Sequence, residues 1–171
     1  MSSAGKNLSS FDSSSVPNAN AYRFGIVVSE WNKEITEALY AGAFSALKEK
    51  GALDENIIRL NVPGSFELTA GAKCMVENEK VDAVICIGCV IKGETSHFDF
   101  ICNAVSNSLS NLNIKYSIPF IFGVLTTDNL VQAKERSGGK HGNKGIEAAI
   151  TAIKMAALKN QFKKGKQIGF R

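Results

Sequence analysis

Hydrophobic positions along the chain fall into two alternating patterns. Four short apolar runs are bounded by glycine, proline, asparagine or serine, as is typical of buried strands. Between them, apolar residues recur every three or four positions, which predicts amphipathic helices. The predicted strands are Tyr22–Val28, Asn56–Val62, Val81–Gly88 and Pro119–Leu125. The predicted helices are Ile35–Leu47 with a glycine stop at Gly51, Phe66–Asn78, Phe98–Leu112, Asn129–Arg136 and Asn143–Lys159.

Strands that alternate with helices, without an internal sequence repeat, predict a four-stranded parallel sheet covered on both faces. The expected fold is α/β, a flavodoxin-like three-layer αβα sandwich. Right-handed crossovers then bring the carboxyl ends of all strands to one edge of the sheet. Four segments should reach that edge: Glu30–Asn32, Pro63–Glu67, the stretch after the third strand, and Phe122–Thr127.

The stretch Gly88–Asp99 is the most informative part of the sequence. It predicts a strand end, a glycine-bounded loop from Gly88, and the start of a helix, with His97, one of two histidines, at the junction. Unpaired N–H groups and the helix dipole favour an anion there. The spacing from Gly88 to Thr95 nearly matches a nucleotide-binding phosphate loop, but Glu94 replaces its essential lysine. A smaller anion, with its cation supplied from elsewhere, is the interpretation that remains.

Other residues at this edge have two interpretations each. Trp31 offers a flat face on which a heteroaromatic ring could stack, or it could pack over the sheet edge. Glu67 could bind a ligand or interact only with the dipole of its helix. Arg136 and Lys144 bracket a predicted glycine-rich loop, Ser137–Gly142, and each could bind phosphate or lie solvated at the surface.

Length and charge narrow the possibilities further. The chain of 171 residues, 44% hydrophobic, fits one domain with a proper core. Its net charge is +4, but five of its twenty basic residues lie in Lys159–Arg171, which contains no acid. The rest is close to neutral, so we do not expect nucleic-acid binding. Residues 1–20 are rich in serine and asparagine and are expected to form a flexible N-terminal arm.

Four cysteines are too few for a disulfide scaffold in a domain of this size, so we expect buried reduced thiols and no metal site. Cys86 and Cys89 form a CxxC pair, but Cys86 lies inside a strand pattern and no second pair follows. No apolar stretch approaches 18 residues, and the first twenty residues lack a hydrophobic signal core. The expectation is a soluble, cytoplasmic protein without membrane contact.

Four motifs, in order and in register, resemble the 6,7-dimethyl-8-ribityllumazine synthase family. The resemblance runs from about Tyr22 to Leu158, so the expected divisions are an arm (1–20), a synthase domain (21–158) and a basic tail (159–171). The motifs are Val62–Leu68, Gly88–Phe98 with one variable position, Phe122–Thr126, and Arg136–Gly138 followed by Gly142–Gly145. Any one of them is weak evidence; together they are specific.

The resemblance implies the penultimate step of riboflavin synthesis. In that step 5-amino-6-(D-ribitylamino)uracil condenses with 3,4-dihydroxy-2-butanone 4-phosphate, with release of water and phosphate. No cofactor or metal is implied. Trp31 is expected to stack on the pyrimidine, and Phe122 of an adjacent subunit to close its pocket. The ribityl chain is expected to contact Ser65, Phe66 and Glu67. The edge of the pyrimidine is expected to bind the backbone of Cys89, Val90 and Ile91.

The remaining implied roles concern phosphate and protons. Glu94 and Thr95 would offer backbone amides to the phosphate, and Arg136 would reach it from a neighbouring copy. His97 matches the proton-transfer residue, and Lys144 the lysine near both substrates. Glu94, where many relatives have a small residue, must point its charge away from the phosphate.

The resemblance also implies a homo-oligomer with shared sites. The smallest assembly that it implies is a pentamer. A shell of sixty subunits is favoured only by the resemblance to relatives that form one. Riboflavin synthase is a candidate partner. Two alternatives from other classes stay open: an inactive flavin-binding or cage-forming relative, and a flavodoxin-type electron carrier. The carrier is disfavoured because Ser29–Asn32, the loop after the first strand, lacks the Ser/Thr-rich phosphate site that flavodoxins have there.

Overall fold

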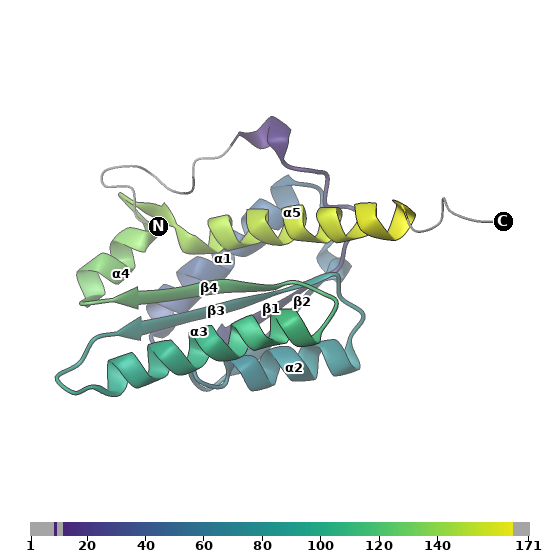
Figure 1. Cartoon of the computed structure of the whole chain (residues 1–171). Coiled ribbons are helices and arrows are strands. Elements are labelled where there is room, and N and C mark those ends of the chain that lie inside the picture. The colour runs from purple at the N-terminus through teal and green to yellow at the C-terminus, as the bar shows by residue number, and fades with distance from the viewer. Residues whose placement is uncertain (1–8, 10–11, 166–171) are drawn as a thin grey trace.

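A four-stranded parallel sheet lies between two layers of helices (Figure 1), as the hydrophobic pattern predicts. The computed structural model describes Ser9 and residues 12–165. The strands, in spatial order β2-β1-β3-β4, are β1 (Phe24–Ser29), β2 (Ile57–Val62), β3 (Ala83–Ile91) and β4 (Phe120–Thr127). The helices are α1 (Lys33–Glu49), α2 (Leu68–Asn78), α3 (His97–Lys115), α4 (Leu130–Arg136) and α5 (Lys144–Gly165).

The two faces of the sheet bury separate hydrophobic clusters, which explains why the strands are apolar throughout. Phe24, Ile26 and Val28 pack with α1 and α5 on one face. Val27 and Val84 pack with α2 and α3 on the other. Successive side chains of a strand point to opposite faces, so a strand buried on both faces needs an apolar residue at every position.

The third strand is longer than the sequence pattern predicts. A loop was expected from Gly88, but Gly88 to Ile91 continue β3, pairing with Val124 to Thr127 of β4. The pairing of β3 with β1 ends at Val28 and Ile87. The last residues of β3 therefore have a neighbouring strand on only one side, and the loop before α3 contains only residues 92–96.

The glycine-rich run, expected to be a loop, forms a short antiparallel hairpin of β5 (Ser137–Gly139) and β6 (Gly142–Asn143) before α5. Asn143 fastens this hairpin to α1. Its side-chain amide donates to the carbonyl oxygen of Ala38 at 2.9 Å, and its side-chain oxygen accepts from the N–H of Gly145 at 2.8 Å. A Cβ on Gly145 would lie 1.8 Å from the Leu39 carbonyl oxygen, so only glycine allows this approach.

The described residues before Ala21 lie against the domain. Val16 and Ala19 are buried in the cluster under α1 and α5. Ser9 donates to the Asn143 carbonyl at 3.2 Å and accepts from the Asn143 N–H. At the other end, α5 continues to Gly165, past the division expected after Leu158. Residues 1–8, 10–11 and 166–171, which include half of the expected flexible arm and the end of the basic tail, lie outside the described residues.

No helix within Ser9 and residues 12–165 combines the length and the apolar character needed to cross a membrane.

Candidate active site

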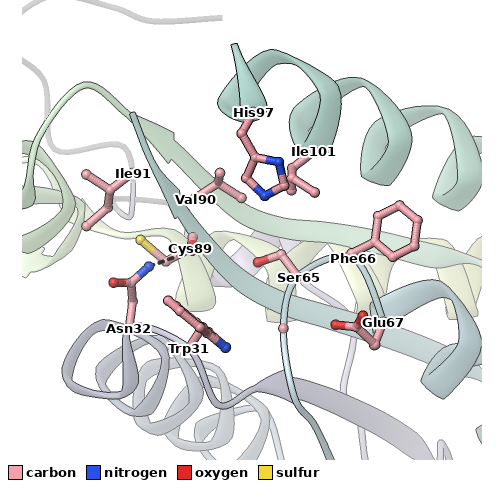
Figure 2. Close-up of a pocket in the computed structure, with 11 residues that line it drawn as sticks. Trp31, Asn32, Ser65, Phe66, Glu67, Cys89, Val90, Ile91, His97 and Ile101 are labelled. Atoms are coloured by element: carbon pink, nitrogen blue, oxygen red, sulfur yellow. Dashed lines mark hydrogen bonds between the residues drawn. The ribbon is translucent and has the colours of Figure 1, made fainter. Parts of the chain in front are cut away.

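A cavity of about 660 Å³ opens at the carboxyl edge of the sheet, between the ends of β1, β2 and β3 and the start of α3 (Figure 2). The parallel strands bring these ends together, as the crossover rule predicts. Eight of the thirteen predicted site residues line it: Trp31, Ser65, Phe66, Glu67, Cys89, Val90, Ile91 and His97. Asn32, Gly64 and Ile101 complete the lining.

Trp31 presents an exposed aromatic face at one side of the cavity. Trp31 is 73% exposed, so its side chain does not pack over the sheet edge of its own chain. Its backbone N–H donates to the Pro63 carbonyl at 3.1 Å, which ties the turn after β1 to the turn after β2. Figure 2 shows Trp31 and His97 on opposite sides of the cavity. A planar ligand could therefore stack on the indole while a polar group faces the imidazole.

The turn between β2 and α2 carries two polar groups suited to ligand hydroxyls. Ser65 is only 7% exposed, and its hydroxyl oxygen has no hydrogen-bond partner among the described residues. Glu67 occupies the N-cap position of α2 without a side-chain capping bond. A buried hydroxyl without a partner is costly, and a ligand that hydrogen-bonds to it would remove that cost.

At the end of β3, some backbone N–H and C=O groups point away from β4, toward the cavity. The N–H of Val84 donates to the Pro119 carbonyl at 2.9 Å, and the N–H of Lys92 to the Thr127 carbonyl at 2.8 Å, so even-numbered residues point toward β4. Peptide groups alternate in direction along a strand, so those of Cys89 and Ile91 point the other way. The Cys89 carbonyl accepts from the side-chain amide of Asn32 at 2.9 Å. Because β1 has already ended there, the backbone groups of Ile91 lie where a ligand edge could pair with them.

Burial keeps the two thiols of β3 protonated. Cys89 lines the cavity, and burial raises the pKa of its thiol to about 11; burial raises the pKa of Cys86 to about 12. Both cysteines are free, as are Cys74 and Cys102. At neutral pH the Cys89 thiol is therefore uncharged. It contributes a weakly polar surface to the cavity and is a poor nucleophile. Within the part of the chain that the structure describes, no three His, Cys, Asp or Glu side chains form a cluster that could hold a metal ion.

The loop before α3 forms the most exposed side of the site. Glu94, Thr95 and Ser96 are exposed, and His97 is the first residue of α3. The backbone N–H of His97 donates weakly to the Thr95 hydroxyl, at 3.4 Å. Ser96 is the N-cap residue and makes no side-chain capping bond. The N-terminus of a 19-residue helix, with its positive dipole end, therefore lies beside an imidazole, an arrangement that suits a phosphate group.

Five predicted site residues do not line this cavity, three of them on β4 or beside the β5–β6 hairpin and two in the loop before α3. Arg136 and Lys144 flank the β5–β6 hairpin, where Glu147 of α5 lies 2.9 Å from Nη2 of Arg136 and 3.3 Å from Nζ of Lys144. The other guanidinium nitrogen of Arg136, Nη1, donates to the His141 carbonyl at 2.7 Å. Phe122 lies on the outer strand β4, opposite Cys86 of β3 and 37% exposed. Glu94 and Thr95, in the exposed loop, do not line the cavity either.

Comparison with known proteins places this site in a family. Residues 21–160 match the family model described as 6,7-dimethyl-8-ribityllumazine synthase. The chain belongs to the 6,7-dimethyl-8-ribityllumazine synthase family. Proteins with that name are 62% identical over 157 residues in Cytophaga hutchinsonii, which is 92% of this chain and 98% of the relative. In Flavobacterium psychrophilum the identity is 58% over 161 residues, 94% of this chain and 85% of the relative. In Porphyromonas gingivalis it is 53% over 158 residues, 92% and 98% of the two chains.

The lumazine synthase family works in riboflavin biosynthesis, and its match includes every element that forms the cavity and the hairpin with Arg136 and Lys144. Motif reasoning missed three lining residues. Asn32 and Gly64 lie inside segments expected at the sheet edge, but nothing in the sequence distinguished them. Ile101 had a detectable signal, because it follows His97 by four residues and so shares its helix face.

Proposed function

We propose that this protein condenses 5-amino-6-(D-ribitylamino)uracil with 3,4-dihydroxy-2-butanone 4-phosphate to give 6,7-dimethyl-8-ribityllumazine, the penultimate step of riboflavin biosynthesis. One observation carries the proposal. In a chain of this family, a single cavity combines an exposed indole face, a buried hydroxyl that has no partner among the described residues and lies near a carboxylate, and an imidazole at a helix N-terminus. These groups match, in turn, a heteroaromatic ring, a polyol chain and a phosphate-bearing ketone.

The pyrimidine ring stacks on Trp31 and pairs with the end of β3. The backbone groups of Ile91 bind its polar edge, because they point away from β4 where β1 no longer offers partners. The carbonyl of Cys89 points the same way, but it already accepts from the side-chain amide of Asn32. Val90 lines the cavity with its side chain, since its own peptide groups point toward β4. The neutral Cys89 thiol suits an uncharged ring edge.

The ribityl chain occupies the turn between β2 and α2. Ser65 and Glu67 bind its hydroxyls, the first through a hydroxyl that has no partner among the described residues and the second as an acceptor. Phe66, which is exposed beside them, covers the carbon chain. A substrate that lacks these hydroxyls should bind much less tightly, since the buried Ser65 hydroxyl would stay unpaired.

The phosphate binds at the N-terminus of α3, to the backbone amides of Glu94 and Thr95. Its side-chain cation is Arg136 of a neighbouring copy, held in orientation by Glu147 and by the His141 carbonyl. A guanidinium that already has two fixed partners loses little conformational entropy when it binds an anion.

The chemistry requires proton transfers more than strong electrophilic activation. The amine of the pyrimidine attacks the ketone, an imine forms with loss of water, phosphate leaves by elimination, and ring closure expels a second water. His97 moves protons in these steps, because an imidazole can both accept and donate near neutral pH. The amine is already a competent nucleophile, so most of the acceleration comes from holding the two substrates together.

Two copies of the chain complete each site. Phe122, Arg136 and Lys144 do not line the cavity of their own chain, and Phe122 is exposed on the outer strand, where it is accessible to a neighbour. We expect Phe122 to close the ring pocket and Lys144 to approach both substrates from that neighbour. The smallest assembly is a pentamer. By analogy with the family, twelve pentamers form a shell of sixty subunits, which could enclose riboflavin synthase. Light scattering distinguishes pentamer from shell.

Lumazine fluorescence tests the proposed function. Adding both substrates to the purified protein should produce it, whereas either substrate alone should not. Binding of the pyrimidine without fluorescence would instead identify the alternative, an inactive relative of the family. Bound flavin mononucleotide in a one-to-one ratio would point to an electron carrier.

A further inference from the structure

The side chain of Asn32 takes the place of a missing strand. The pairing of β1 with β3 ends at Val28 and Ile87, yet β3 continues to Ile91. Beyond that point the side-chain amide of Asn32 donates to the Cys89 carbonyl at 2.9 Å, the dashed contact in Figure 2. This bond lies at the floor of the cavity, between the turn that carries Trp31 and the strand end expected to bind the pyrimidine.

The backbone of Asn32 is also unusual. Within Ser9 and residues 12–165, it is the one non-glycine residue with positive φ, at φ 57° and ψ 45°. Asparagine tolerates this left-handed conformation better than most residues. Asn32 is the N-cap residue of α1, where an asparagine side chain usually caps the helix, but it makes no such bond. Its amide is used for Cys89 instead.

These two features bear on the position of Trp31, the residue before Asn32. The indole is largely exposed, so few side-chain contacts hold it. Its backbone is fastened on both sides, by the N–H of Trp31 to the Pro63 carbonyl at 3.1 Å and by the side chain of Asn32 to the Cys89 carbonyl. The path of the Trp31 backbone relative to the end of β3, from which the ring projects, therefore depends in part on the Asn32 contact.

We propose that Asn32 is a positioning residue that sets the gap between the Trp31 ring and the end of β3, and thereby determines affinity for the aminopyrimidine. The proposal rests on the proposed function, because it assigns the gap to that substrate. Asn32 itself needs no contact with the reacting atoms. It acts by holding a stacking face and a hydrogen-bonding edge at a separation that a flat ring can fill.

Two variants distinguish the effect of the Asn32 hydrogen-bond donor from the effect of its left-handed backbone conformation. Asn32→Asp keeps the size and the tolerance of the left-handed conformation, but turns an oxygen toward the Cys89 carbonyl. Asn32→Gly keeps the backbone conformation and removes the side chain. The matched control is Asn78→Asp at the end of α2, because the Asn78 amide also donates to a backbone carbonyl, that of Cys74, at 2.8 Å and outside the cavity.

Kinetics give the first readout. Both Asn32 variants should raise the KM for 5-amino-6-(D-ribitylamino)uracil about tenfold and leave kcat and the KM for the butanone phosphate within about twofold. Asn78→Asp should change none of the three. An equal rise in both KM values, or wild-type affinity for the pyrimidine in both variants, would overturn the proposal.

Trp31 gives the second readout, because it is the only tryptophan in the chain. Time-resolved fluorescence anisotropy without substrate should show a larger amplitude of nanosecond indole motion in both Asn32 variants than in the wild type and in Asn78→Asp. Unchanged indole motion would overturn the positioning role. This measurement needs no turnover, so it decides the role of Asn32 even if the wild type makes no lumazine; that failure would instead refute the proposed function.

Discussion

Arg136 and His97 should contribute differently to the proposed reaction. Arg136→Ala removes a charge-assisted bond to phosphate, so the KM for the butanone phosphate should rise roughly 10- to 100-fold. His97→Ala should lower kcat by a smaller factor, because positioning supplies most of the acceleration. Steady-state kinetics with each substrate varied in turn measures both effects.

Arg136→Lys serves as the control for that comparison. It keeps the positive charge but loses the planar fork that Glu147 and the His141 carbonyl orient, so it should recover only part of the affinity. The interpretation would be wrong if His97→Ala reduced turnover at saturation more than Arg136→Ala reduced phosphate affinity.

Single residues at the site were predictable when position alone singled them out. Trp31 and Glu67 each follow a strand end, and both line the cavity as expected. Asn32 was not predictable, because its role depends on a carbonyl 57 residues away in sequence and on how far β3 extends past β1. Local sequence carries no information about that length.

Among the helices, the packing of α5 on α1 imposes the strictest steric requirement. Gly145→Ala would place a Cβ 1.8 Å from the Leu39 carbonyl oxygen, so α5 and the hairpin would have to move. We expect a loss of about 3 kcal/mol in the free energy of unfolding. Urea unfolding at a fixed protein concentration measures it.

Gly93→Ala is the matched control for the same added methyl group. No atom lies within 4 Å of a Cβ at Gly93, in the loop before α3, so its stability should change by less than about 0.5 kcal/mol. Equal stability of the two alanine variants would contradict the tight contact between α5 and α1.

Periodicity located each strand of the parallel sheet and each α-helix, but not each boundary and not the β5–β6 hairpin. The pattern of β3 predicts a strand up to Gly88, while the structure extends it through Ile91 because β4 offers partners as far as Thr127. The glycine-rich run was expected to be a loop, because a hairpin this short contains too few residues to show alternation. In both cases pairing with a distant segment decided the structure, and local propensity could not.

For the whole molecule, the main question is how many copies form one site. The fold was predictable because alternating strands and helices allow few topologies. The sharing of sites came only from the family resemblance, since nothing in one sequence indicates which surface meets a neighbour. The chain itself contributes one relevant observation: Phe122, Arg136 and Lys144 lie apart from the cavity they are proposed to complete.

Complementation between two impaired variants tests this account most directly, when it is assayed at a butanone phosphate concentration below the wild-type KM, where the raised KM of Arg136→Ala leaves that variant almost without activity. Glu67→Ala disables the cavity of its own chain, and Arg136→Ala disables the cation lent to a neighbour. If the two variants are refolded together in equal amounts, random assortment should restore about a quarter of the sites, and with them about a quarter of wild-type lumazine formation. A mixture no more active than the average of the two separate variants would contradict the shared site.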